Sequence, residues 1–232
     1  MNPLTAFIDL FFPRICFGCD IRLHGEEKIL CLNCESTLNF LIDVCEICGS
    51  PENPSTCPVC NSNEFVFDKA RSVFPFSANV KNLIHELKYN EMKRITKYLG
   101  GYITEYLHHF QPFENIDIVT PVPLHKVKKR ARGFNQSEFL SKEISIHMNW
   151  SHISNLVLRN RFTDTQTKLD RKQRQENVSD AFILNSKFNI QNKNILIVDD
   201  VFTTGSTVNS ICKLLKKNLG GRIYVLTIAR AL

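Results

Sequence analysis

Basic side chains are scarce in the first part of this 232-residue chain. Through residue 65 there are three Lys or Arg residues against nine Asp or Glu residues, which gives a formal charge of −6. The remaining residues carry 26 basic against 14 acidic side chains, or +12, so the overall charge of +6 conceals two different halves. Because phosphates are attracted to positive charge, only the second half is expected to bind polyphosphates or nucleic acid directly.

Long hydrophobic runs are also missing. No stretch approaches the roughly 18 apolar residues that a bilayer-spanning helix needs, so the protein is not expected to be integral to a membrane. Residues 1–12 are apolar, but this segment is short, contains Asp9 and lacks a basic leader, which argues against a secretory signal and leaves a docking helix open. We therefore expect a cytoplasmic protein, with peripheral attachment to the inner membrane left open.

Disulfides are not expected in a reducing cytoplasm, yet the chain contains nine cysteines. Eight of them form four C-x-x-C pairs, separated by 11, 10 and 8 residues. Each such turn places two thiolates on one side of a tight loop, and two turns complete a closed tetrahedral zinc shell. The spacing predicts two structural Zn²⁺ sites, with interleaved pairing as the alternative to the sequential sets Cys16, Cys19, Cys31, Cys34 and Cys45, Cys48, Cys57, Cys60.

The length of the chain allows one full α/β domain and a small additional module. We predict a double zinc-ribbon module over residues 1–65, folded by its metal ions because so short a segment buries little surface. Residues 66–232 then form the α/β domain. Lone Cys212 lies on the apolar face of an expected helix and is interpreted as a core residue.

The most distinctive segment, residues 195–207, has neither a G-x-G-x-x-G motif nor a P-loop lysine, which argues against a dinucleotide-binding domain and an NTPase. The apolar run Ile195–Val198 predicts a buried parallel strand that ends at Asp199 and Asp200. A turn around Gly205 follows, and then an amphipathic helix begins. Hydroxyls and backbone amides at a helix start suit a phosphate, whereas paired carboxylates suit vicinal hydroxyls. The pattern therefore indicates a ribose 5-phosphate unit as the ligand.

This segment resembles the phosphoribosyl-pyrophosphate (PRPP) signature of type I phosphoribosyltransferases. The resemblance implies that Asp199 and Asp200 hold the ribose hydroxyls, as the catalytic pair, with Mg²⁺ accompanying PRPP. It also implies that the 5′-phosphate is bound by the loop that follows, Thr203, Thr204, Gly205, Ser206 and Thr207.

Hydrophobic patterns in the second half predict strands that alternate with helices. Strands are expected at 65–67, 70–76, 116–119, 156–158, 181–184, 195–198 and 223–228, and helices at 80–89 and 92–110 and after residue 136. Such alternation predicts an α/β fold with a mainly parallel sheet of five strands flanked by helices, as in type I phosphoribosyltransferases.

Two basic segments are candidates for the pyrophosphate side of the site. Two prolines after the strand at 116–119 predict a rigid loop. The basic run that follows, residues 126–132, is interpreted as a phosphate-facing loop. The second basic segment, residues 159–177, is interpreted as a lid. The residues assigned to these roles are Leu124, His125, Lys126, Arg130, Arg132, Arg161 and Arg171.

Several short motifs resemble those of the ComF family, the double-zinc-ribbon, phosphoribosyltransferase-like proteins of bacterial competence. They are the four C-x-x-C pairs, Leu87-Lys88-Tyr89, Pro121-Val122-Pro123, Arg132-Gly133-Phe134-Asn135-Gln136, Arg161, Gln166, Arg171, Asn177 and Asp199-Asp200. The resemblance implies a cytosolic PRPP-binding protein that handles single-stranded DNA during natural transformation. The second half is also similar to the synthase domain of glutamine amidophosphoribosyltransferases, but residue 2 is Asn, so the N-terminal cysteine nucleophile of those enzymes is lacking.

Three functions remain open from the sequence. The first is a transferase that displaces pyrophosphate from PRPP toward an unknown acceptor. The second is a PRPP-binding module whose basic segments and Phe134 and Phe162 grip single-stranded DNA. The third is an adaptor that docks a competence helicase or membrane channel protein through residues 1–65, with a vestigial PRPP site.

Overall fold

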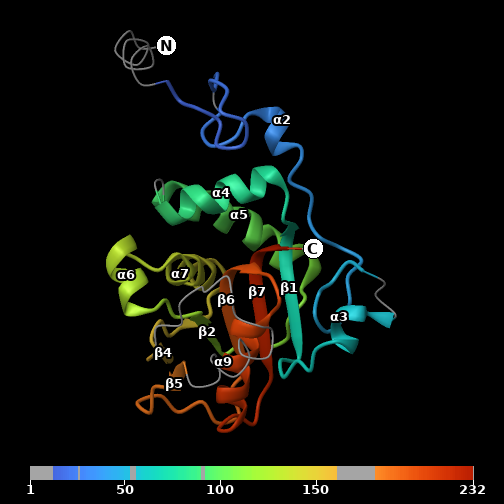
Figure 1. Ribbon diagram of the computed structural model, residues 1–232, viewed down its shortest axis with the longest axis vertical. Coiled ribbons are helices and arrows are strands. Elements are labelled where there is room, and N and C mark those ends of the chain that lie inside the picture. Colours follow the sequence, from blue (N-terminus) through green and yellow to red (C-terminus); the bar gives the residue numbers. More distant parts are fainter. Residues whose placement is uncertain (1–12, 26, 53–55, 90–91, 161–180, 232) are drawn as a thin grey trace, which may run out of the picture.

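The central feature of the computed structural model is a five-stranded parallel sheet, as predicted (Figure 1). The structure describes residues 13–25, 27–52, 56–89, 92–160 and 181–231. The sheet has the order β1-β7-β6-β2-β3, and all four neighbouring pairs are parallel. Its strands are β1 (Lys69–Pro75), β2 (Ile118–Pro121), β3 (Ser151–His152), β6 (Ile195–Phe202) and β7 (Ile223–Arg230).

Two of the predicted strands form outside the main sheet, and a third predicted strand is absent. The segments expected at 156–158 and 181–184 are β4 (Val157–Arg159) and β5 (Phe182–Leu184), which pair antiparallel with each other outside the main sheet. Each buries its first residue and exposes the next, which suits a ribbon packed on one face only. Residues 65–67 are not a strand, and the Val66 amide donates to the Asn209 side chain and not to a neighbouring strand. The short edge strand β3 was not expected.

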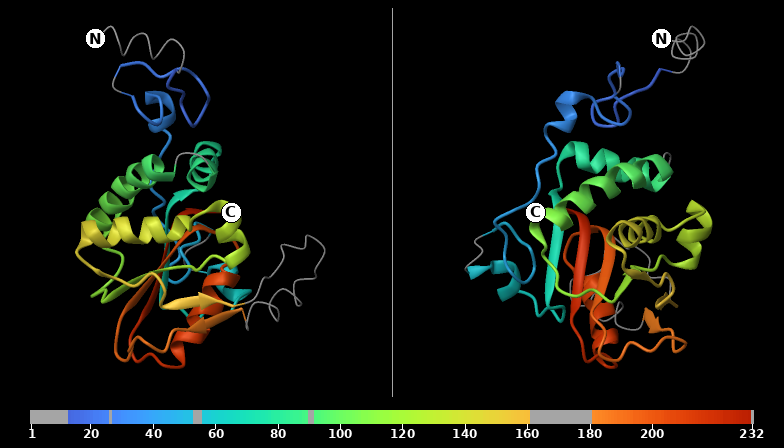
Figure 2. Two further views of the ribbon diagram at one scale, coloured as in Figure 1. Left: turned by 90° about the vertical axis from the view of Figure 1, so that its left-hand side faces the viewer. Right: turned by 180° about the vertical axis from the view of Figure 1, so that it is seen from behind.

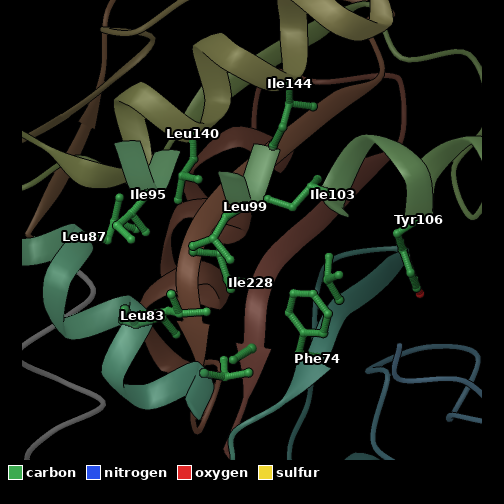
Figure 3. Close-up of a cluster of buried hydrophobic side chains, with 14 of the residues drawn as sticks. Phe74, Leu83, Leu87, Ile95, Leu99, Ile103, Tyr106, Leu140, Ile144 and Ile228 are labelled. Carbon is green, nitrogen blue, oxygen red and sulfur yellow. The ribbon is translucent and has the colours of Figure 1, made fainter. Parts of the chain in front are cut away.

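Helices cover both faces of the sheet. On one face, α4 (Ala78–Tyr89), α5 (Met92–Phe110) and α7 (Gln136–Met148) share an apolar cluster with alternate residues of the central strands, including Leu196 and Val198. Figure 3 shows side chains of this cluster, including Leu83, Leu99 and Leu140 from the helices and Phe74 and Ile228 from the strands. On the other face, α9 (Ser206–Lys216) packs against Ile195 and Ile197 and buries Cys212, as expected for a core residue. Each fully buried aliphatic side chain contributes about 1.5–3 kcal/mol to folding.

The two cysteine clusters lie in different places on this core. The first, with α2 (Leu32–Glu35), belongs to the apolar cluster of α4 and α5, and the second, with α3 (Pro58–Asn61), belongs to the cluster of α9. The segment between them runs beside β1, where the Leu41 amide donates to the Val73 carbonyl over 2.8 Å. Figures 1 and 2 show the segment around α2 above α4 and the segment around α3 beside the other end of β1. The domain boundary at residue 65 stays a prediction.

Candidate functional site

The acid pair lies where β6 extends beyond its neighbour β2. The last paired residue of β2 is Pro121, opposite Val198, and the next amide, that of Val122, donates to the Val198 carbonyl. Asp199 and Asp200 are therefore flanked on one side by the open end of β2. The expectation that the strand ends at the acids is wrong, because on the other side β6 stays paired with β7 as far as Phe202.

The first turn of α7 faces both acids. The helix begins after Asn135, whose side chain caps the Ser137 amide and donates to the Val122 carbonyl over 3.0 Å. Gln136 Nε2 then donates to Asp200 Oδ2 over 2.9 Å, and Ser137 Oγ donates to Asp199 Oδ1 over 2.9 Å. The N-terminus of a helix carries partial positive charge, so its position stabilises the two carboxylates.

Lys88 is a site residue to which the sequence analysis assigned no role. It lies in the last turn of α4, and its Nζ is 2.6 Å from Asp200 Oδ2, the oxygen that Gln136 also contacts. Arg132 donates to Gln136 Oε1 over 2.6 Å and stacks on the ring of Tyr89, 5.1 Å from its centroid. Residues from α4, the end of α6 (Lys126–Arg132) and α7 thus form one network on a single carboxylate. The Leu87-Lys88-Tyr89 motif was the available signal for Lys88.

Asp199 and Asp200 have different electrostatic surroundings. Burial, followed by the neighbouring charge of Asp200, raises the pKa of Asp199 to about 7, and the Ser137 hydroxyl opposes this shift. Asp200 is only 7% exposed but has the Lys88 ammonium beside it. Burial also lowers the pKa of Arg159 on β4, and the charge of Asp199 opposes that shift. Asp200 therefore has a cation beside it, whereas Asp199 has a pKa near neutrality.

The segment predicted to hold a 5′-phosphate is the turn between β6 and α9. Thr203 and Thr204 are exposed, and Gly205 is the N-cap of α9 with a φ of 73°. A β-carbon at Gly205 would lie 2.5 Å from Phe202 Cζ, so both the backbone conformation and the space require glycine. The Thr204 hydroxyl lies 2.7 Å from the Ser206 hydroxyl and accepts from the Ser206 amide. Hydroxyls and helix-start amides are thus gathered in one turn.

The predicted pyrophosphate residues are arranged differently from expectation. Lys126–Arg132 is the helix α6, so the interpretation of this run as a loop is wrong. His125 is its buried N-cap and accepts from the Val127 amide over 3.2 Å, which stabilises the helix start at Lys126. Lys126 and Arg130 are exposed, Leu124 is half-buried, and Arg132 reaches the acid network. Arg161 and Arg171 lie outside the described residues, as does most of the predicted lid.

The eight paired cysteines form two groups, and the grouping is sequential rather than interleaved. In each group the Sγ atoms lie within 4.8 Å of one another, and the groups are Cys16, Cys19, Cys31, Cys34 and Cys45, Cys48, Cys57, Cys60. Sulfurs at tetrahedral corners around zinc are about 3.8 Å apart for Zn–S bonds of about 2.3 Å. The Cys19–Cys31 and Cys45–Cys60 separations are both 3.8 Å. Both groups therefore fit zinc in chemistry and in size.

The chain is similar to a known protein family and to several known proteins. Residues 136–230 match the profile of the phosphoribosyl transferase domain family. The chain is 30% identical over 227 residues to Competence protein F of Haemophilus influenzae, covering 95% of this chain and 99% of that protein. It is 30% identical over 230 residues to DNA utilization protein YhgH of Escherichia coli K12, covering 96% and 100%. A solved adenine phosphoribosyltransferase is similar with a TM-score of 0.38 and 14% identity, over 58% of this chain and 71% of that chain.

The parallel sheet and the matched domain define a protein of the phosphoribosyltransferase fold with two added four-cysteine sites. The identity to the competence and DNA-utilization proteins extends over almost the whole chain, including the cysteine region. The chain belongs to the ComF family. None of the helices in the described ranges combines the length and apolar character that crossing a bilayer requires.

Proposed function

We propose that this protein binds PRPP at the carboxyl end of β6 and acts in the cytoplasm in DNA uptake, where it handles single-stranded DNA. One observation carries the proposal. The segment Asp199–Ser206 contains both the acid pair and a helix start capped by glycine, and it lies beside the open end of β2. The names of the relatives, which refer to competence and DNA utilization, support the biological setting.

In this proposal each part of the site binds one part of PRPP. The carboxylates of Asp199 and Asp200 accept hydrogen bonds from the ribose 2′ and 3′ hydroxyls, because an ionised carboxylate offers acceptors only and each hydroxyl can donate one proton. The turn Thr203–Thr207 surrounds the 5′-phosphate with amides and hydroxyls. Lys88 and Arg132 supply positive charge next to the acid pair. Mg²⁺, which favours carboxylate and phosphate oxygens, would neutralise the pyrophosphate when PRPP is bound, near the same two acids.

Calorimetry with PRPP and Mg²⁺ tests this assignment. We expect the wild type to bind and Asp200→Asn to lose binding, because a neutral amide accepts weaker hydrogen bonds than a carboxylate does. Asp117→Asn is the matched control, since Asp117 lies just before β2 at the opposite end of the sheet, beside Lys193. Unchanged affinity in Asp200→Asn would remove the assigned role.

The proposed single-stranded DNA surface is formed by α6 and the start of α7. Lys126, Lys129 and Arg130 are exposed on α6, with Glu138 as an acidic neighbour of Lys129 at 3.3 Å. The ring of Phe134 lies 6.1 Å from that of Phe139, which is at the surface. A row of cations beside accessible rings suits a flexible strand, because the cations contact phosphates and the rings stack on bases.

Fluorescence anisotropy with a labelled oligonucleotide at several salt concentrations tests the DNA surface. We expect Arg130→Glu to weaken binding and to reduce the slope of log affinity against log salt by about one per lost phosphate contact. Lys187→Glu, an exposed lysine in the loop after β5, makes the same charge change elsewhere and should affect binding less. Equal weakening by both variants would contradict a localised surface.

Transferase activity is the second candidate, favoured by the position of Lys88. A cation beside the acid pair could stabilise charge that develops as pyrophosphate leaves the ribose. Pyrophosphate release from PRPP and Mg²⁺, measured with nucleobases and amines as acceptors, tests this activity. Release that is equal in the wild type and in Lys88→Met would exclude such a role for Lys88.

Docking of a competence helicase or membrane channel protein is a further candidate for residues 1–65. The first cysteine cluster exposes Ile21 and Leu32, which are 54% and 74% accessible. Direct binding to the purified helicase should weaken in Leu32→Ser. It should persist in Ile47→Ser, which changes an equally apolar residue, 47% accessible, beside the second cluster.

A further inference from the structure

The second cysteine cluster is connected to the end of the sheet by a buried arginine. Arg230, the last residue of β7, is 3% exposed. Its Nη1 donates to the Cys48 carbonyl over 2.6 Å, and its Nη2 lies 3.7 Å from Cys48 Sγ. A four-thiolate zinc site carries a net charge of about −2, so a buried guanidinium at this position compensates it.

The same guanidinium contacts the strand that leads into the phosphate turn. It lies 4.5 Å from the ring centroid of Phe202, the last residue of β6. That ring is in turn in close contact with Gly205, because a β-carbon there would lie 2.5 Å from Phe202 Cζ. Cys48, Arg230, Phe202 and Gly205 are therefore in consecutive contact, from the metal-site candidate to the turn.

A second connection starts from the chain that leaves Cys60. Phe65 stacks on Phe67 at 4.8 Å, and both rings meet Phe202 edge-on at 6.1 Å. In the first turns of α9, the Asn209 side chain donates to the Glu64 carbonyl and accepts from the Val66 amide, each over 2.8 Å. The segment that follows the cluster thus supports both the turn and the helix start.

The first cluster is attached to different elements. The Asn82 side chain on α4 donates to the Gly18 carbonyl over 3.1 Å, and the Arg94 guanidinium on α5 donates to the Lys28 carbonyl over 2.7 Å. Tyr98 on α5 donates to Glu35 over 3.0 Å. The two clusters have the same ligands but different neighbours, which makes one an internal control for the other.

We infer that the zinc-loaded second cluster positions the turn proposed to bind a 5′-phosphate, through Arg230, Phe202 and the segment 61–67. This inference rests on the proposed PRPP function only for the identity of the ligand. Without metal, four thiols no longer hold residues 45–60 together, and the supports of Phe202 and Asn209 are lost. The binding-competent turn is then a smaller fraction of the population, and the apparent dissociation constant rises by the inverse of that fraction.

The test compares Cys60→Ser with Cys19→Ser in the full chain. Zinc content is measured by mass spectrometry, hydrogen exchange is measured on peptides covering residues 202–210 without ligand, and PRPP affinity is measured by calorimetry. Each variant should lose one of the two zinc ions that the cysteine groups predict. We expect Cys60→Ser alone to expose residues 202–210 to exchange and to weaken PRPP binding by about tenfold or more.

Unchanged exchange at residues 202–210 in a zinc-depleted Cys60→Ser protein would overturn the inference, and so would equal effects of the two variants. Because hydrogen exchange is measured on the free protein, it tests the inference even if the wild type fails to bind PRPP. Failure of the wild type to bind PRPP would contradict the proposed function and not this inference.

Should Cys60→Ser unfold the whole chain, Arg230 variants decide the question. Arg230→Met should lower zinc affinity of one site by about 10- to 100-fold and deprotect residues 202–210, whereas Arg230→Lys keeps the charge and should restore part of both. Arg94→Met is the matched control at the first cluster and should leave residues 202–210 protected. Protection of these residues in Arg230→Met would overturn the inference.

Discussion

Lys88 Nζ lies 2.6 Å from Asp200 Oδ2, which joins the end of α4 to the acid pair on β6. The two side chains retain 25% and 10% of their accessible surface, so the pair is partly shielded from water. Gln136 donates to the same oxygen, and Arg132 orients Gln136. Any ligand that binds Asp200 must therefore be accommodated by this network, and the contributions of its members can be measured separately.

Lys88→Met should destabilise the protein by about 1–3 kcal/mol, because the buried carboxyl group of Asp200 loses its cationic partner. Urea unfolding measures the change. Lys81→Met on the exposed face of the same helix is the control and should change stability by less than about 0.5 kcal/mol. In the double-mutant cycle with Asp200→Asn, a coupling energy of zero would contradict a direct interaction between Lys88 and Asp200.

Asp199→Asn should make the protein more stable at about pH 7.5 and less dependent on pH than the wild type. Burial and the charge of Asp200 raise the pKa of Asp199 from 3.8 to about 7, so the folded state binds more protons than the unfolded state between these values. Wild-type stability therefore falls as pH rises through this window. Urea unfolding at about pH 5.5 and 7.5 measures the difference.

Asp117→Asn is the control for this pH dependence. The Asn194 amide and the Lys193 ammonium hold the pKa of Asp117 below its ordinary value, so its contribution to stability is lost only at more acidic pH. The variant should lose similar stability at both pH values. A wild type whose stability rises from pH 5.5 to 7.5, with the rise kept in Asp199→Asn, would contradict the raised pKa of Asp199.

Gly205→Ala should reduce both stability and PRPP binding, because the left-handed backbone is strained for alanine and the new methyl group would meet Phe202. We expect a loss of about 1–3 kcal/mol in unfolding free energy. Gly101→Ala, within α5 and with no atom near the added carbon, should stabilise the protein by about 0.5–1 kcal/mol. Normal PRPP affinity in a folded Gly205→Ala protein would contradict the role of this turn in binding PRPP.

The purified protein should contain two zinc ions per chain, one for each cysteine group. Strong chelators should remove both and lower the melting temperature, because metal binding supplies folding free energy to these short segments. Cys212→Ala should keep both ions, since this residue lies on the buried face of α9 and belongs to neither group. Loss of zinc in that variant would contradict the grouping.

Much of the site was predictable because its parts are adjacent in sequence. The strand, acids, turn and helix of residues 195–216 follow one another, so their order along the chain is also their order in space. The C-x-x-C spacing likewise reports local turns, and the structure closes them in sequential groups. The errors concern the partners of a strand. The sequence patterns of β4 and β5 are those of strands, but contacts between residues far apart in the sequence decide that they pair with each other and not with the main sheet.

The sequence by itself determined the kind of chemistry available: paired acids before a glycine turn, thiolates in four pairs and a basic second half. Only the tertiary structure decided that Lys88 and Gln136 meet on Asp200 and that Arg132 supports Gln136. Lys88 and Gln136 lie 48 positions apart in the sequence, and Gln136 and Asp200 lie 64 positions apart. It also decided that the two cysteine groups attach to different faces of the core. Local patterns encode backbone preferences and exposure, whereas such meetings depend on how helices and strands pack over long separations.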